Sequence, residues 1–155
     1  MGAASGLRRL RGFTLVELLV VFAILAMLVA LVPLAFGKLR EAAQYRDSVR
    51  SMITDMRSAR TRAISVGADV RFIVDTAARS YGVEGGAMHR LPEPLVMRAT
   101  VANQEITAGR LASIRFLPGG GATGGSIDIV RPSGSGVRLR VDWLFGRVEQ
   151  EGIGS

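Results

Sequence analysis

The stretch Arg11-Gly12-Phe13-Thr14-Leu15-Val16-Glu17 begins an apolar segment that continues without a charge from Leu18 to Gly37. A helix needs about 20 apolar residues to cross the hydrocarbon core of a bilayer, and this segment has that length. The leader before it carries Arg8, Arg9 and Arg11 and no acid. Because basic flanks stay in the cytoplasm, the sequence predicts a single membrane helix over residues 13–37, with the rest of the chain on the far side.

Glu17 is the one acid at the front edge of this segment. A carboxylate that reaches the centre of a bilayer costs roughly 2.5–3.5 kcal/mol on insertion scales. We therefore expect a partner charge for Glu17. The alternative is an interfacial glutamate whose side chain reaches back to the lipid headgroups.

The arrangement of leader, glycine and glutamate resembles the class III signal of type IV pilins and type II secretion pseudopilins. The resemblance implies that a prepilin peptidase cuts after Gly12 and methylates the new amine on Phe13. It also implies that Glu17 pairs with the N-terminal amine of a neighbouring subunit during assembly. An ordinary secretory signal peptide or an uncleaved anchor fits less well, since Glu17 interrupts the start of the apolar run and no clear small-x-small cleavage site follows it.

Helical spacing continues beyond the apolar segment, where apolar residues recur every three or four positions over residues 38–66. Gly67 is a plausible stop, so we expect one helix from about residue 13 to residue 66. Pro33 removes one backbone hydrogen bond, and we expect a kink or local melting near Pro33 and Gly37. These two residues are either a tolerated membrane proline with a nearby glycine or a hinge used during assembly.

After Gly67 the pattern changes to short alternating strands separated by glycine and proline. The strands are expected at residues 69–75, 80–83, 95–101, 111–117, 126–130 and 137–144, with a short one near 146–148. The fold class is therefore α+β: a long N-terminal helix, transmembrane in its first half, packs on an antiparallel β-sheet or small β-sandwich formed by residues 67–155.

Later segments resemble the H-type minor pseudopilins, also called GspH/FimT-like. They are Ser58–Ile64, Phe116–Gly120, Gly124–Ile127 and Val141–Val148. Gly119 departs from the family pattern, which has a polar residue after the proline. The resemblance implies a pilin-like fold and a minor pseudopilin of the type II secretion system, located near the tip of the periplasmic pseudopilus, that helps export folded proteins across the outer membrane.

The same resemblance implies location in the bacterial inner membrane, a single pass, a periplasmic C-terminal domain, and contacts with membrane lipid. Implied partners are other major and minor pseudopilins, the prepilin peptidase/methyltransferase and the inner-membrane assembly platform. Two alternatives stay open: a FimT-like minor type IV pilin for pilus priming or DNA uptake, and an anchored periplasmic domain that never polymerises.

Composition argues against several other functions. The net charge is +7, but loss of the leader leaves 17 basic residues against 13 acidic ones, scattered along the chain, so nucleic acid is not the expected partner. There is no cysteine and one histidine, His89, and the acids lack calcium-loop spacing, so no metal site or cofactor is expected. The stretch Gly119–Gly124 matches G-x-G-x-x-G, but a strand rather than a helix is expected after it. No enzyme activity is predicted.

Three residues are candidate partner contacts. Trp143 is expected in the core or half-buried on the last long strand, with a partner-binding tryptophan as the alternative. Arg57 and Arg60 lie with Arg62 on a basic helical turn. That turn is either a solvated face or a contact with an acid of the next subunit or, in a DNA-uptake pilin, with DNA.

Overall fold

The computed structural model describes residues 13–101, 106–107 and 111–154, without the side chains of residues 31–36, 38 and 106–107. The predicted leader and cleavage residue Gly12 lie outside this part of the chain. The chain divides into two compact units, residues 1–40 and 41–155, and each is described by itself.

Helix α1 spans Leu15–Val66 and contributes to both units. Thr14 caps its start, because the Thr14 hydroxyl accepts a hydrogen bond from the Glu17 amide at 3.2 Å. Gly67 ends it with a φ of 69°, and its amide donates to the Ala63 carbonyl at 3.0 Å. The helix predicted from the sequence is therefore confirmed to within two residues at its start.

Helix α1 continues through positions 33 and 37. Local melting, one of the two expected effects of Pro33, is therefore not present. A proline removes a single amide donor, and the intact turns on either side keep the backbone helical. The hinge role of Pro33 and Gly37 stays a prediction.

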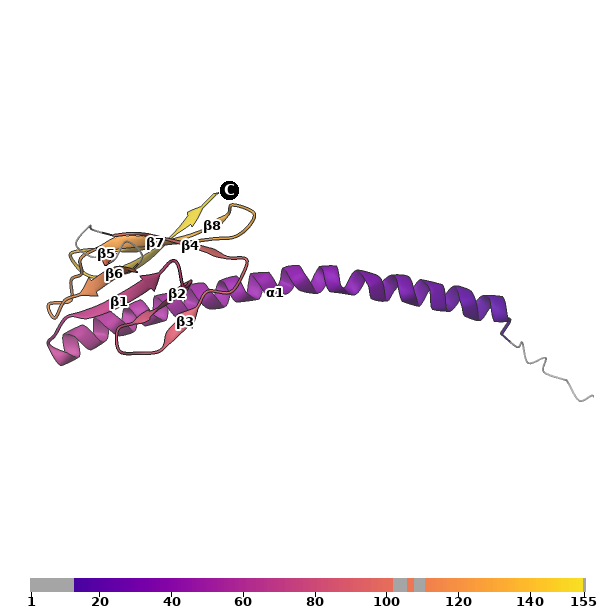
Figure 1. Ribbon diagram of the computed structural model, residues 1–155, viewed down its shortest axis with the longest axis horizontal. Coiled ribbons are helices and arrows are strands. Elements are labelled where there is room, and N and C mark those ends of the chain that lie inside the picture. The colour runs from indigo at the N-terminus through magenta and orange to yellow at the C-terminus, as the bar shows by residue number, and fades with distance from the viewer. Residues whose placement is uncertain (1–12, 102–105, 108–110, 155) are drawn as a thin grey trace, which may run out of the picture. The chain divides into compact units, whose positions relative to one another are not determined.

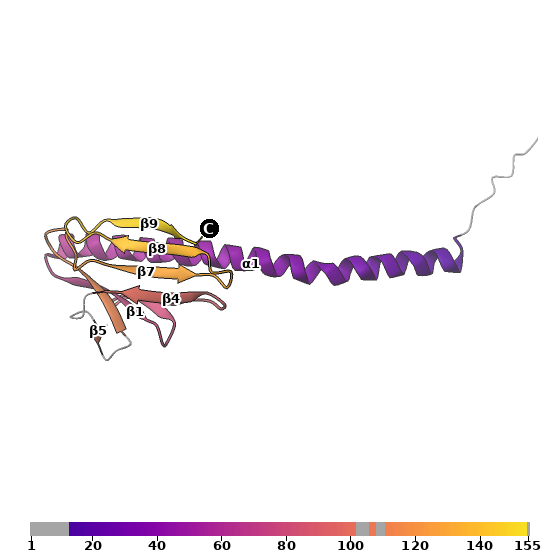
Figure 2. The same ribbon diagram turned by 90° about the horizontal axis from the view of Figure 1, so that it is seen from above.

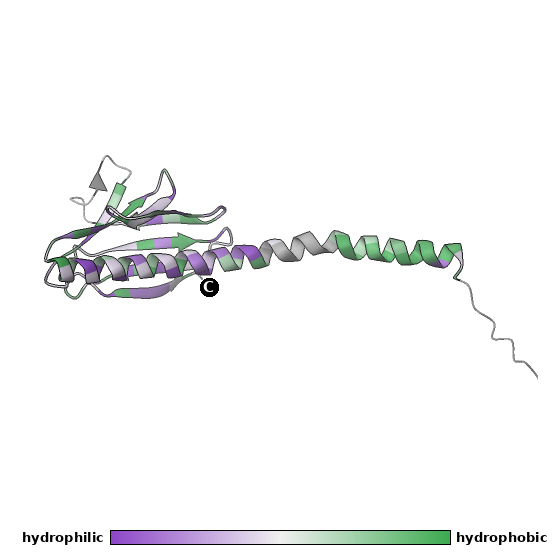
Figure 3. Cartoon of the chain, turned by 90° about the horizontal axis from the view of Figure 1, so that it is seen from below, coloured by the Kyte–Doolittle hydropathy of each residue, from purple (hydrophilic) through white to green (hydrophobic). Residues whose placement is uncertain are grey.

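The large apolar side chains that the structure describes in the first unit are exposed, with exposed fractions between 43% at Val21 and 82% at Leu15. Figure 3 shows the first turns of α1 in green, the colour of hydrophobic residues. Among the helices that the structure describes, none meets the length and apolarity required to cross a membrane.

The second unit contains two antiparallel sheets (Figure 1). The first has the strand order β3-β2-β1-β6-β5, and the second has the order β4-β7-β8-β9. Figure 2 shows β9, β8, β7 and β4 lying side by side, which makes β9 and β4 the edge strands of the second sheet. The strands are β1 Val70–Asp75, β2 Ser80–Val83, β3 Met88–Arg90, β4 Val96–Thr100, β5 Ile106–Thr107, β6 Leu111–Phe116, β7 Gly125–Val130, β8 Gly136–Val141 and β9 Val148–Ile153.

One hydrophobic core joins α1 to both sheets. Met52, Met56 and other residues of the predicted helical stripe are fully buried, as are Phe72 and Phe116 of the first sheet and Leu139 of the second. The stripe therefore packs as its spacing predicts, and the α+β class is confirmed, with the strands arranged in two antiparallel sheets.

Two strands were not predicted from the sequence. Strand β3 is exposed along its length and shows no alternation, and β5 is only two residues long. The strand predicted to reach residue 144 instead ends at Val141, because Asp142 starts a turn. The predicted core position of Trp143 is therefore wrong: its side chain lies on that turn and is 68% exposed.

Candidate functional site: an aromatic turn beside an arginine pocket

The connection between β8 and β9 presents three consecutive large apolar side chains to solvent. Trp143, Leu144 and Phe145 are 68%, 53% and 52% exposed. We call residues 142–147 the aromatic turn. Clustered exposed apolar surface on a folded domain is typical of a contact site for a protein or a membrane.

Hydrogen bonds hold the backbone of this turn. The Asp142 carboxylate accepts from the Phe145 amide at 2.7 Å, and the Asp142 carbonyl accepts from the Gly146 amide at 2.9 Å. Gly146 has a φ of 59°, which a residue with a Cβ adopts only at a cost. The aromatic side chains are therefore displayed from a fixed backbone and not from a loose loop.

Arg60 joins the aromatic turn to the helix and to the glycine-rich loop after β6. Its Nε donates to the Phe145 carbonyl at 2.9 Å and to the Gly120 carbonyl at 3.1 Å. The Trp143 carbonyl in turn accepts from the Ala122 amide at 2.9 Å. Arg60 therefore stabilises the position of the turn, a role that the sequence pattern did not reveal.

A pocket of about 370 Å³ lies between the last turns of α1 and the aromatic turn. We call it the arginine pocket, because its lining includes Arg57, Arg60 and Arg147, together with Thr61, Gly146 and Val148. The Arg147 guanidinium lies 4.9 Å from the centre of the Phe145 ring, within cation–π distance. Three guanidinium groups around one hollow favour an anionic ligand.

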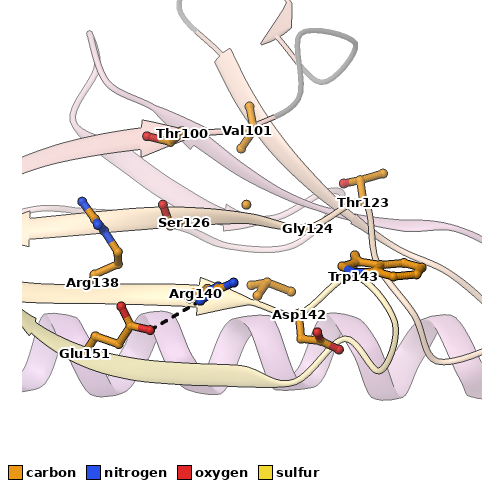
Figure 4. A pocket seen from close by; sticks show the side chains of 12 residues that line it. Thr100, Val101, Thr123, Gly124, Ser126, Arg138, Arg140, Asp142, Trp143 and Glu151 are labelled. Carbon is orange, nitrogen blue, oxygen red and sulfur yellow. Dashed lines mark ion pairs between the residues drawn. The ribbon is translucent and has the colours of Figure 1, made fainter.

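A second, larger groove of about 600 Å³ crosses the second sheet (Figure 4). Trp143 lies at one end of it, and Glu151 lies toward the other end, where it pairs with Arg140 at 3.8 Å. Arg138 pairs with Asp128 through two hydrogen bonds of 2.8 and 2.9 Å, which raise the pKa of Arg138 above its usual value. Because its arginines are paired, this groove has less unbalanced charge than the arginine pocket.

The single histidine belongs to a small polar cluster between α1 and the first sheet. His89 Nε2 lies 3.5 Å from Asp55 Oδ2, and the His89 ring lies 5.7 Å from the Tyr81 ring. Burial raises the pKa of Asp55, and the charge of His89 partly opposes that shift. Over the described ranges, no group of three or more histidines and acids could hold a metal ion.

The glycine-rich stretch after β6 leads into a strand. Gly124 has a φ of 76°, and β7 begins at Gly125, so no helix N-terminus follows the G-x-G-x-x-G match. A phosphate at this loop would lack the aligned amides of a helix start.

The structure brings together three of the residues singled out from the sequence. Arg57 and Arg60 line the arginine pocket, and Trp143 lies on the adjoining aromatic turn. Phe13 lies two residues before α1 and Glu17 lies in its first turn; both are exposed and distant in the sequence from this site.

Sequence reasoning missed Leu144, Phe145 and Arg147 as parts of the same surface. The missed signal was Asp142, whose side chain commonly caps turns, followed four residues later by glycine. Together these residues indicate a turn where the apolar run alone suggested a strand.

Comparisons with known proteins match both parts of the chain. The family model for the type II transport protein GspH matches residues 48–144, and that for the prokaryotic N-terminal methylation motif matches residues 7–33. The type II secretion system protein H of Xanthomonas campestris pv. campestris is 33% identical over 143 residues, which cover 91% of this chain and 83% of the relative. The minor pseudopilin EpsH of Vibrio cholerae has a similar fold, with a TM-score of 0.55 at 16% identity over 70% of this chain and 96% of that one.

Proposed function

Because the chain belongs to the GspH family and is a minor pseudopilin of the type II secretion system, we propose that it acts near the tip of the periplasmic pseudopilus and helps export folded proteins across the outer membrane. The observation that carries the proposal is the presence of both the GspH match and the methylation motif in one chain. The family consists of structural pseudopilins, not enzymes. Its members are membrane-anchored periplasmic subunits whose partners are other pseudopilins.

The processing and topology proposals concern the first unit. Prepilin peptidase would cut after Gly12 and methylate Phe13, and the basic leader would remain cytoplasmic. Residues 13–37 would then form a single inner-membrane span, with the β-rich domain in the periplasm and the assembly platform as a further partner. The exposed apolar side chains at the start of α1 support this proposal, since water is a poor environment for them.

Glu17 would pair with the Phe13 amine of a neighbouring subunit in the fibre. Apolar helices exclude water there, so opposite charges attract strongly, and an unpaired charge would cost several kcal/mol. We expect Glu17→Ala to insert in the membrane but to enter the fibre poorly, as measured by cross-linking to other pseudopilins. Asp47→Ala, which removes an exposed acid farther along α1, is the matched control. Equal incorporation of both variants would refute the pairing.

For the contacts proposed at Arg57, Arg60 and Trp143, we favour a protein partner over nucleic acid. An aromatic turn beside one compact pocket is suited to a peptide segment. A DNA-uptake pilin would instead require several phosphate contacts along an extended basic surface.

Deletion of the gene in its native host, with plasmid complementation, tests the proposed function. We expect several secreted enzymes to disappear from the medium and to accumulate in the periplasm. An unchanged set of secreted proteins would contradict the proposal. Transformation frequency would then decide whether the DNA-uptake alternative is correct.

A further inference from the structure

The arginine pocket and the aromatic turn together form a surface suited to one kind of ligand. We propose that they bind an acidic segment of another pseudopilin. A carboxylate of that segment lies between Arg57 and Arg147, and a neighbouring apolar side chain packs on Trp143 and Leu144. The inference rests on the proposed function, because it takes the partner from the same fibre.

The first argument is unbalanced charge. Among the residues that the structure describes, Arg57 and Arg147 have no acidic side chain at ion-pair distance, although both line the pocket. Five other arginines of the second unit do have such partners, namely Arg71, Arg79, Arg115, Arg138 and Arg140, whereas exposed arginines such as Arg62 and Arg98 have none within the described part of the chain but do not line the pocket. The two pocket arginines therefore have guanidinium donors to offer to an external carboxylate.

The second argument is preorganisation. Arg60 and Asp142 hold the aromatic turn through four hydrogen bonds, one from Arg60 and three made by Asp142, so binding requires little ordering of the backbone. Tryptophan and arginine are the side chains most enriched among residues that dominate binding energy. Here both types lie next to each other on a rigid turn.

The third argument distinguishes a carboxylate from a nucleic-acid backbone. Three arginines line one pocket of about 370 Å³, and the adjacent aromatic turn exposes apolar side chains. Across the neighbouring sheet, Asp128 and Glu151 neutralise Arg138 and Arg140. The arginine pocket is large enough for one or two acidic side chains. A DNA strand is longer and would also contact the second sheet, where acidic side chains already pair with the arginines.

The single tryptophan of the chain provides a direct reporter, because Trp143 lies on the proposed surface. The emission of the full chain in detergent micelles would be titrated with an acetylated Glu-Leu-Glu peptide. The matched probe is the Gln-Leu-Gln peptide, which has the same shape and no charge. We expect a saturable change in Trp143 emission with the acidic peptide only, and we expect added salt to weaken the binding.

Two variants separate binding in the arginine pocket from the effect of the overall positive charge on affinity. The double variant Arg57→Gln/Arg147→Gln should weaken binding of the acidic peptide by about tenfold or more, the range of a lost charge-assisted contact. Arg62→Gln removes an exposed arginine outside the pocket and should leave binding unchanged. Far-ultraviolet circular dichroism would confirm that each variant is folded. The proposal would be overturned if the wild-type chain responded equally to both peptides. It would also be overturned if the wild type and the double variant bound the acidic peptide equally well. Tighter binding of a short single-stranded oligonucleotide than of the acidic peptide would also overturn it.

A photo-cross-linking residue placed at Leu144 tests the same surface in the native host. We expect cross-links to another pseudopilin that disappear in the Arg57→Gln/Arg147→Gln background. If deletion of the gene stops secretion but these cross-links do not depend on the arginines, the inference fails and the proposed function stands. If deletion leaves secretion intact, the proposed function fails whatever the cross-links show.

Discussion

Replacing Arg60 with methionine should destabilise the second unit while keeping most of the side-chain volume. The change removes the Nε donor shared by the Phe145 and Gly120 carbonyls. A hydrogen bond from a charged donor contributes roughly 1.5–3 kcal/mol, and because one N–H serves both acceptors we count it once, at about 2 kcal/mol. For a unit of residues 41–155, about 1 kcal/mol shifts Tm by roughly 4 °C, so we expect a loss of about 8 °C.

Thermal unfolding of the full chain in detergent, followed by Trp143 emission, measures this effect. The tryptophan lies in the second unit, so its signal reports that unit and not the micelle-bound part of α1. Arg62→Met is the matched control, since Arg62 is exposed on the same helical turn and does not line the pocket. Unfolding of Arg60→Met at the same temperature as Arg62→Met would refute the stabilising role of Arg60.

Three further changes probe the loop, the core and the polar cluster. A Cβ on Gly121 would lie 2.9 Å from the Trp143 carbonyl, so Gly121→Ala should cost about 1–3 kcal/mol in chemical denaturation, whereas Gly119→Ala, with open space around it, should be nearly neutral. Phe116→Ala empties a fully buried site and should cost about 3–5 kcal/mol by the same assay, so a loss of under about 1 kcal/mol would contradict the core assignment. Burial raises the pKa of Asp55 above 3.8, so the folded state retains a proton that the unfolded state releases, and stability falls as pH rises above about 4. Asp55→Asn should remove that fall, with a Tm equal to wild type below about pH 3 and higher than wild type above pH 4; a wild-type pH profile would contradict it.

The sequence predicts the helix and most of the strands because their signals are local. Thr14 and Gly67 mark the two ends of α1 through a cap and a left-handed glycine. Val70, Phe72 and Val74 alternate as a half-buried strand requires, and all three are buried in β1. By contrast, β3 forms only because β2 offers an edge to pair with, and no pattern in its own residues indicates a strand.

The candidate site could be predicted only in part, because its parts meet through tertiary structure. Arg57 and Arg60 are recognisable as a basic turn, but nothing in their spacing indicates that Arg60 reaches the Phe145 carbonyl, 85 positions later. Trp143 was misplaced because its apolar run continues directly from β8. The turn depends on hydrogen bonds to Asp142, which compete locally with strand continuation and end the strand there.

The edge strand β9 limits the ways in which copies of this chain can associate. Its exposed residues include Glu149, Gln150 and Glu151, and two such edges brought together would place acids against acids. Membrane-anchored subunits meet often. An open, uncharged edge strand would therefore promote uncontrolled strand pairing between copies, as in amyloid. The acids on β9 discourage that route, and the pairing proposed for Glu17 would leave ordered polymerisation to the start of α1.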